Sequence, residues 1–481
     1  MGSQVMENTK RKNFIINFFD KLAPERKSWI YKNLAFHAND IKYMRFLIPP
    51  NQKILELGCG TGHLLSELSP SIGVGVDFSQ RMIDIARSEN PNLDFHVGDI
   101  EDPKFVRLLK GPYDYIVLSD SIGMFEDIES TLTNLHQLCS PDTRIVLAYY
   151  SQIWNPILKI GEYLKLKMPQ VEQNWLGLRD LERLFNLSNF EVVRREWRQL
   201  IPKNWFGIGN LINRYLATLP FIRYLCLRNY LVVRSRSVYC DLPKSVTVLI
   251  PCRNEEGNIE PAIRRIPEFC NDLEILFVEG HSTDRTLSEI NRVITKYPGK
   301  NIKLLKQPGR GKGDAVRAGF EVSEGQILMI LDADLTVPPE MLPNFFRAIA
   351  SGKGEFINGS RLIYPMEEGA MRFLNQLANR SFSMLLSWLM SQTVTDTLCG
   401  TKVLSKQHYK RIAENRYYFG DFDPFGDFDL LFGADKLNLK IIEVPVRYAA
   451  RYYGETQISR FQDGWKLMRM VGFAYRKLKA F

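Results

Sequence analysis

Two carboxylates, Asp332 and Asp334, stand one residue apart directly after the apolar run Gln326–Leu331. Carboxylates at positions i and i+2 after a strand can reach one divalent cation, and hard oxygen ligands favour Mg²⁺ or Mn²⁺. Such a cation can neutralise a diphosphate and stabilise it as a leaving group. An Asp-x-Asp pair is common in solvated turns, but this one follows a run typical of a buried strand. The pair therefore predicts metal-assisted chemistry on a diphosphate.

The residues expected to share a site with this pair follow three earlier apolar runs, Ser245–Ile250, Leu273–Val278 and Ile302–Lys306. Helical stretches separate the runs, and this alternation predicts a parallel sheet whose loops gather at one edge. Charged or turn-forming residues stand after each run: Pro251, Arg253 and Glu255, then Glu279, then Lys312.

This series resembles the family-2 inverting glycosyltransferases with the GT-A fold, especially the dolichol-phosphate mannosyltransferase-like branch, over about residues 245–465. The resemblance implies a nucleotide-sugar donor, with Asp332 and Asp334 on the metal. It also implies roles around the nucleotide: Pro251, Arg253 and Glu255 around the base, Glu279 near it, and Lys312 near the ribose or phosphate. Glu279 stands where the family usually has Asp, and Thr336 where dolichol-phosphate enzymes often have Gln, so the donor base stays open.

The acceptor side of this half carries carboxylates and arginines. The family places its acceptor-side carboxylate near Asp427 and Asp429, and either could be the base that a hydroxyl acceptor needs, whereas a phosphate acceptor needs none. Guanidinium groups bind oxyanions bidentately, which suggests phosphate clamps: Arg361, Arg447 and Arg451. The apolar stretch Arg372–Met390 is equally typical of a helix resting on a membrane and of one packed on its own domain.

The first half contains a second chemical motif, Gly58-Cys-Gly-Thr-Gly62, between the strand-like Lys53–Leu57 and the helical pattern His63–Leu68. Glycines let the backbone turn sharply and approach a ligand closely. Three acidic residues stand at strand ends: Glu56, Asp77 and Asp99. A carboxylate in the position of Asp77 can accept both ribose hydroxyls.

This arrangement resembles the class I S-adenosylmethionine-dependent methyltransferases, clearly over about residues 40–150 and less so to about 236. The resemblance implies that Gly58, Gly60 and Gly62 line the methionine and ribose. It also places Glu56 at the ammonium through backbone or water, Asp77 at the ribose and Asp99 facing the adenine. The glycine spacing differs from the dinucleotide G-x-G-x-x-G, which disfavours a NAD domain.

No catalytic base is evident in this half. His63, His96 and His136 are the nearest histidines, and a lone histidine is more often a hydrogen-bonded structural residue than a base. Methyl transfer often needs only proximity to the sulfonium, so the lack of a base does not argue against activity.

The stretch Trp205–Leu227 mixes large apolar residues with arginines. It fits either a basic amphipathic segment on a membrane surface or an insertion packed over the active site. We favour the packed insertion because Pro220 interrupts the long helix that a membrane stripe would need.

Bulk properties set the frame. The 481 residues with a net charge of +9 predict a multidomain globular protein with anionic partners. The seven cysteines form no Cys-x-x-Cys pair, and no run approaches the roughly 20 apolar residues of a spanning helix. We expect a cytoplasmic protein, in peripheral contact at most with the inner membrane face, and no nucleic-acid partner, since no RNA-binding signature occurs.

The sequence thus predicts an α/β protein of two tandem Rossmann-like domains. A methyltransferase domain at 1–236 precedes a linker at 237–244 and a GT-A glycosyltransferase domain at 245–481. The expected function is bifunctional, with sugar transfer to a lipid-phosphate or glycan acceptor and methyl transfer to a related substrate, in surface glycan or glycolipid synthesis. The alternatives are one active domain beside a docking module, or an RNA-directed methyltransferase with a nucleotide-sugar sensing domain.

Overall fold

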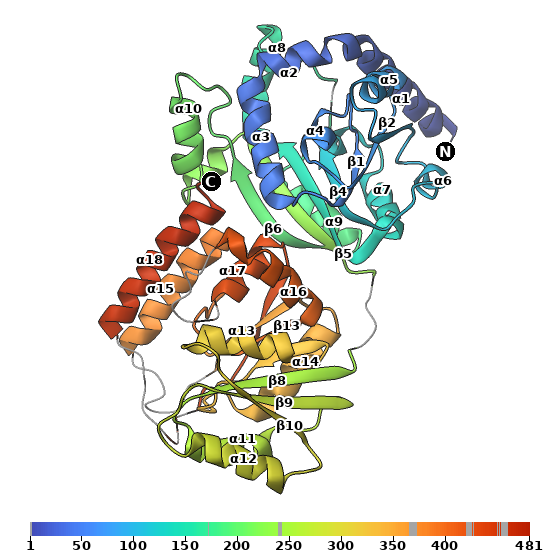
Figure 1. Cartoon of the computed structure of the whole chain (residues 1–481). Helices are drawn as coiled ribbons and strands as arrows, with labels where there is room; N and C mark the ends of the chain where they lie inside the picture. Colours follow the sequence, from blue (N-terminus) through green and yellow to red (C-terminus); the bar gives the residue numbers. More distant parts are fainter. Residues whose placement is uncertain are drawn as a thin grey trace. The chain divides into compact units, whose positions relative to one another are not determined.

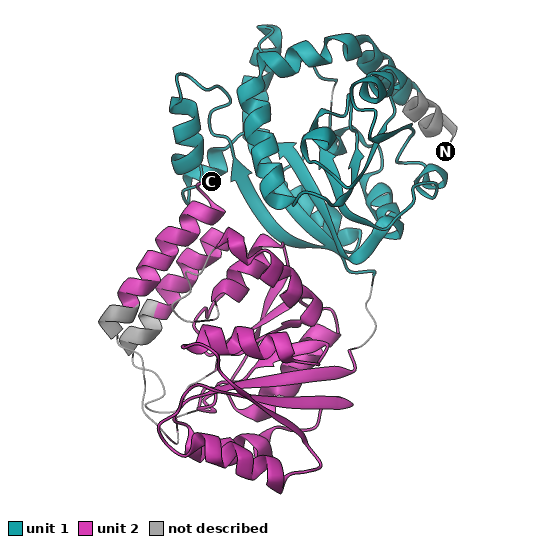
Figure 2. Ribbon diagram, in the orientation of Figure 1, with its two compact units in different colours: residues 1–239 teal, residues 240–481 magenta. Residues whose placement is uncertain are grey.

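The computed structural model describes residues 2–171, 173–238, 243–364, 373–419, 426, 428–449, 451, 453 and 460–481, without the side chains of 2–9, 373–378 and 460–463. The chain forms two compact units, Met1–Tyr239 and Cys240–Phe481 (Figure 2). The boundary falls within the expected linker 237–244, of which residues 239–242 lie outside the described range.

Unit 1 is built on a seven-stranded sheet in the order β3-β2-β1-β4-β5-β7-β6 (Figure 1). Its strands are β1 Lys53–Leu57, β2 Ile72–Asp77, β3 Asp94–Val97, β4 Tyr113–Ser119, β5 Cys139–Tyr150, β6 Phe190–Arg198 and β7 Arg228–Ser235. Strand β7 runs antiparallel to both β5 and β6, and the other pairs are parallel. The strand order reverses between β1 and β4, where open α/β sheets bind ligands.

The helices of unit 1 cover both the sheet and its carboxyl edge. They are α1 Gly2–Leu22, α2 Arg26–Lys32, α3 Leu34–Leu47, α4 His63–Glu67, α5 Gln80–Glu89, α6 Pro103–Val106, α7 Ile128–Asn134, α8 Asn155–Tyr163, α9 Leu178–Leu187 and α10 Ile208–Leu211. A π-helical turn, Ile212–Leu216, continues α10, and a 3₁₀ turn, Ile222–Leu225, follows Pro220. The expected interruption at Pro220 is therefore present.

Unit 2 has its own seven-stranded sheet, in the order β10-β9-β8-β11-β13-β12-β14. The strands are β8 Ser245–Cys252, β9 Asp272–Glu279, β10 Asn301–Lys306, β11 Ile327–Ile330, β12 Phe356–Ser360, β13 Lys402–Ser405 and β14 Ile441–Pro445. Only β13 pairs antiparallel, with β11 and β12, among these strands. Here the order reverses between β8 and β11, so a second ligand edge is expected there.

The helices of unit 2 alternate with these strands. They are α11 Glu256–Arg265, α12 Thr286–Lys296, α13 Lys312–Val322, α14 Leu342–Ala350, α15 Phe373–Met390, α16 Lys406–Glu414, α17 Phe428–Lys436 and α18 Arg460–Leu478. The expectation of two tandem Rossmann-like α/β units is confirmed. Within the described parts of the chain, no helix has the length and apolar character needed to cross a membrane.

Candidate active sites

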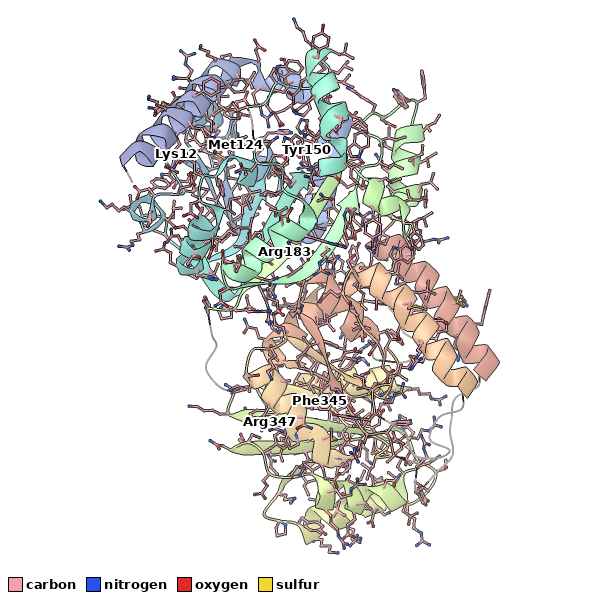
Figure 3. The ribbon with its side chains drawn as sticks, turned by 180° about the vertical axis from the view of Figure 1, so that it is seen from behind. Lys12, Met124, Tyr150, Arg183, Phe345 and Arg347 are labelled. Atoms are coloured by element: carbon pink, nitrogen blue, oxygen red, sulfur yellow. The ribbon has the colours of Figure 1, made fainter. Side chains whose placement is uncertain are left out.

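A cavity of about 440 Å³ lies at the carboxyl edge of the unit 1 sheet, enclosed by residues of α1, α2, α3 and α8. Figure 3 labels three of its lining residues, Lys12, Met124 and Tyr150, in a row across unit 1. Five of the six residues expected to bind the cofactor line this one cavity: Glu56, Gly58, Gly60, Asp77 and Asp99.

The sixth residue, Gly62, does not line the cavity. It precedes α4 with a φ of 74°, and a Cβ added there would lie 2.6 Å from the ring of Phe95. Gly60 also has a positive φ, 53°, but a Cβ added there would meet nothing within 4 Å. Gly62 therefore shapes the loop, while Gly60 leaves room in the cavity for a ligand.

The carboxylate of Asp77 is held in place by the backbone. Gly60 N–H donates to its Oδ2 at 2.9 Å, and Ser79 N–H donates to its Oδ1 at 2.9 Å. Each oxygen keeps a further lone pair for a hydroxyl group. The position after β2 thus fixes an acceptor at the cavity wall, which suits a ribose.

Glu56 carries one of the buried polar atoms at the cavity wall that lack a hydrogen bond from any described residue, and Ser121 carries another. Burial raises the pKa of this glutamate to about 8, and a hydrogen bond from Leu65 N–H offsets the effect only in part. Among the described residues, no group hydrogen-bonds its Oε2. A buried carboxyl with a vacant acceptor fits an ammonium group, as in the amino-acid end of S-adenosylmethionine.

Asp99 has a partner from the N-terminal helix. Lys12 Nζ of α1 lies 2.8 Å from Asp99 Oδ2 and 2.8 Å from Glu101 Oε2. This link brings α1 over the expected adenine end of the cavity. Lys12 has no sequence motif that could have indicated this role.

The strongest charge cluster of unit 1 was not predicted. The fully buried Arg228 donates to both oxygens of Asp40 at 3.2 Å and to Asp120 Oδ1 at 2.5 Å, and Tyr230 also donates to Asp40. The guanidinium carbon of Arg228 lies 4.9 Å from the ring centre of Tyr150. Asp120 has a φ of 58° and lines the cavity. Its place at the end of β4 was the only sequence signal.

Two histidines face the cavity and two do not. Burial and the nearby Arg26 lower the pKa of His37 to about 4, and its ring centre lies 6.3 Å from that of His63. The ring of His136 lies 2.7 Å from both Ser235 Oγ and the Ser188 carbonyl, and His96 lies 2.9 Å from Asp94. His96 and His136 thus have the structural partners that a lone histidine usually has, whereas His37 was missed.

In unit 2, the carboxylates after β11 are each paired with a cation. Lys312 Nζ lies 2.7 Å from Asp332 Oδ1, and Arg451 Nη2 lies 2.5 Å from Asp334 Oδ2. Burial would raise the pKa of Asp332, but the Lys312 ammonium holds it below its usual range. Thr336 donates through N–H and Oγ1 to Asp334 Oδ1.

The donor set of this pair fits a divalent cation. Both side chains are acceptor-only carboxylates, and both are partly accessible. The backbone of Gly400 approaches so closely that an added Cβ would lie 2.0 Å from Asp332 Oδ2. Only glycine leaves room for the carboxylate there.

The expected nucleotide residues gather beside this pair. Strands β8 and β9 pair Pro251 with Val278 and Cys252 with Glu279, which brings the two loops together. Glu279 Oε1 accepts from Ser282 N–H at 2.6 Å, and Glu255 Oε2 accepts from Asn258 Nδ2 at 2.6 Å. Arg253 follows in the same loop. The buried Gln307, which donates to the Gly311 carbonyl at 2.7 Å, was not foreseen.

The residues expected on the acceptor side differ in the partners that they have. Arg361 Nε and Nη2 donate to the two oxygens of the buried Asp396 at 2.7 and 2.8 Å, so two of its three nitrogens already serve the fold. Asp429 Oδ2 lies 3.4 Å from both Arg317 and Arg416.

Two further acceptor-side residues were named. Asp427 lies outside the described residues, although the neighbouring Gly426 packs on Gly313 next to Lys312. Arg447 is exposed, with its guanidinium carbon 5.9 Å from the ring centre of Tyr364.

Fold and sites define two α/β domains with separate ligand edges, one around an enclosed cavity and one around a carboxylate pair. Residues 31–195 match the family model described as Methyltransferase domain, and residues 247–412 match that of Glycosyl transferase family 2. The chain therefore contains a methyltransferase domain followed by a family 2 glycosyltransferase domain, as the sequence predicts.

Individual relatives align with one half of the chain. A dolichol-phosphate mannosyltransferase of Pyrococcus furiosus is 29% identical over 241 residues, covering 49% of this chain and 64% of the relative. A low-salt glycan biosynthesis hexosyltransferase of Haloferax volcanii is 27% identical, covering 48% and 54%. The chain thus spans between about half and two thirds of the length of these relatives.

Among solved structures, a methyltransferase from Thermotoga maritima, named as a possible histamine N-methyltransferase, aligns with a TM-score of 0.36 at 15% identity. That alignment covers 46% of this chain and all of the other.

Replacing Glu56 by Gln should remove a pH dependence of stability. With a folded pKa of about 8 and an unfolded value near 4.5, the folded protein holds a proton that the unfolded chain releases between these values. The free energy of unfolding therefore falls as pH rises through this window, on the order of a few kcal/mol in all. In calorimetric unfolding of the ligand-free protein, the free energy of unfolding of Glu56→Gln should rise relative to that of the native protein as pH rises. The control Glu129→Gln, at an exposed site on α7, should show no such relative rise. If the stability of Glu56→Gln and of the native protein changed with pH in parallel, the raised pKa of Glu56 would be contradicted.

Replacing Arg228 by Met should leave Asp40 and Asp120 buried without their cation. We expect a loss of about 3–5 kcal/mol in the free energy of unfolding of unit 1. Denaturant titration measures it, with the exposed Arg107→Met as the matched control. Adding Asp40→Asn should restore part of the loss, because one of the two uncompensated charges is removed. An additive double variant would show that the three side chains are not coupled.

Proposed function

We propose that the chain is a bifunctional transferase. Unit 2 transfers a sugar from a nucleotide-sugar donor to a lipid-phosphate or glycan acceptor, a polyprenyl phosphate being the acceptor that fits its relatives best. Unit 1 transfers a methyl group from S-adenosylmethionine to a related substrate. The product belongs to surface glycan or glycolipid synthesis.

One observation carries the sugar-transfer proposal. The carboxylates of Asp332 and Asp334 lie at the edge where the strand order reverses between β8 and β11, each beside a partly exposed cation. Mg²⁺ or Mn²⁺ bound there supplies charge neutralisation for a nucleoside-diphosphate leaving group. Lys312 and Arg451 then lie where they can turn from the carboxylates to phosphate oxygens. Glu279 and Arg253 are the polar groups available to the base.

For unit 1, the support is the convergence of Glu56, Gly60, Asp77 and Asp99 on one cavity. S-adenosylmethionine supplies an electrophilic methyl group on a sulfonium. Asp77 would hold the ribose, and Glu56 would release its proton to solvent and pair with the ammonium. The acceptor atom would form its bond to the methyl carbon as the carbon–sulfur bond breaks to leave a thioether, and the acceptor's proton would pass to water. His37 is neutral but, with a pKa of about 4, a weak base, so the rate rests on proximity.

Paired variants test whether both units are active. Asp334→Asn should lower metal-dependent turnover of the accepted nucleotide sugar at least about a hundred-fold and leave S-adenosylmethionine binding unchanged. Gly60→Val should do the reverse, because its side chain would enter the cavity from a backbone with a φ of 53°.

The assays screen UDP, GDP and dTDP sugars with Mn²⁺ or Mg²⁺, and titrate the cofactor calorimetrically. Asp272→Asn, at an exposed site of unit 2, is the control. No turnover or binding of any donor by the native protein would favour the alternative, in which unit 2 is a docking module.

A further inference from the structure

Exposed apolar side chains frame the mouth of the unit 1 cavity. Ile157 of α8 and Leu166 after it both line the cavity, yet 56% and 49% of their surfaces are exposed. Four further exposed side chains surround them: Ile153, Ile160, Tyr163 and Leu164. Soluble proteins rarely expose apolar side chains gathered in one patch, so this border needs an explanation.

A second exposed segment continues this surface. Most of the large apolar side chains between Trp205 and Leu225 are exposed, and in this described part of the chain only the flanking Pro202, Lys203 and Leu227 line the cavity. The expectation of an insertion packed over the active site is therefore wrong for most of its apolar residues. Trp154 Nε1 donates to the Leu225 carbonyl at 2.8 Å and joins the start of α8 to the end of this segment.

Helix α2 joins the two segments at a second point. Lys32 Nζ donates to the Lys165 carbonyl, and Lys203 Nζ donates to the Lys32 carbonyl at 3.2 Å. Figure 1 accordingly places α8 beside α2. We call the exposed apolar side chains of residues 153–166 and 205–225 the rim.

Two aromatic residues of the rim are held in an unfavourable backbone conformation. Phe206 and Phe221 have φ values of 47° and 68°, which bulky residues rarely adopt. Phe206 is fully exposed and Phe221 is 84% exposed, so packing within unit 1 does not offset this strain. Strain of this kind persists mainly where it serves a contact with something else.

The charge around the rim identifies that contact. Residues 201–227 contain Lys203, Arg214 and Arg223 and no acidic residue. Residues 151–170 contain three lysines and one acidic residue, Glu162, which pairs with Lys167. Scattered aromatic and aliphatic side chains among basic ones, on short helices rather than in a groove, match an anionic lipid surface.

We propose that the rim docks unit 1 on an anionic lipid surface with the cavity mouth facing the lipid, and that the methyl acceptor is an amphiphile taken from that surface. The acceptor part rests on the proposed methyl transfer, whereas the docking part does not. This arrangement accounts for the apolar cavity mouth, because an amphiphile would pass from lipid to cavity without crossing water.

Vesicle binding of the full chain tests the docking. The protein should bind mixed phosphatidylcholine–phosphatidylglycerol vesicles more tightly than pure phosphatidylcholine vesicles, and salt should weaken the binding. The variant Trp205→Ser/Phe206→Ser should lower the partition coefficient at least about tenfold. Leu187→Ser, at a site of similar exposure (67%) on α9, should leave it unchanged. If the double variant binds vesicles as tightly as the native protein, binding does not depend on the rim and the proposal is overturned. Absence of vesicle binding by the native protein would overturn it as well.

A local probe tests the orientation. An environment-sensitive dye on Ile157→Cys should shift to the blue on mixed vesicles, and the same dye on Leu187→Cys should not. Equal shifts at both sites, or none at Ile157→Cys, would overturn the facing of the cavity mouth. A concentration-dependent shift without vesicles would show that a second copy covers the rim instead.

Calorimetric binding of S-adenosylmethionine by the same variants keeps the two proposals apart. Retained cofactor binding with lost vesicle binding supports docking through the rim. Absent cofactor binding in the native protein would overturn methyl transfer, and with it the amphiphilic acceptor, while the vesicle result would still decide the docking.

Discussion

The structure of unit 1 depends on the guanidinium of Arg228, which is buried between Asp40 and Asp120. These three residues come from β7, α3 and the end of β4, so the contact ties the N-terminal helices to the edge of the sheet. A buried charge is tolerated only when it is paired and hydrogen-bonded, and each of the three charges depends on the others. Helices α1 to α3 cover the cavity, and Arg228 fixes α3 of that cover to Asp120 at the end of β4.

In unit 2 the carboxylates of Asp332 and Asp334 are also paired with cations, but these cations are less buried. Lys312 and Arg451 are partly exposed, whereas Arg228 is fully buried. Under the proposed function, a metal ion would take over the compensation of these carboxylates, and the Lys312 ammonium and the Arg451 guanidinium would then meet phosphate oxygens. The same need for a neighbouring cation is therefore met by a fully buried arginine in unit 1 and by partly exposed cations in unit 2.

Sequence reasoning predicted what depends on chain order and missed what depends on contacts between distant segments. Motifs at strand ends identified both sheets, because glycines and carboxylates after buried runs are local signals. Asp40, Arg228 and Lys12 carry no such signal, since each gains its role from partners 87 or more residues away. Arg361 stands in the region where the sequence predicts a phosphate clamp, yet the buried Asp396 accepts hydrogen bonds from two of its nitrogens. The exposure of Phe206 and Phe221 could not be predicted either, because apolar content alone does not separate a packed segment from an exposed one.

The burial of the paired cations differs between the two units, and this difference bears on which part of a substrate each unit suits. In unit 1 the fully buried Arg228 is paired with two carboxylates and does not line the cavity, while the exposed Ile157 and Leu166 at the cavity mouth suit an apolar group. In unit 2 the cations beside Asp332 and Asp334 are partly accessible, which suits the diphosphate and the phosphate acceptor of the proposed function. An amphiphile with an anionic head and an apolar body has one part that matches each unit. Under the proposed function, a lipid-linked sugar would therefore suit both sites with one class of molecule, through charge compensation in unit 2 and burial in unit 1.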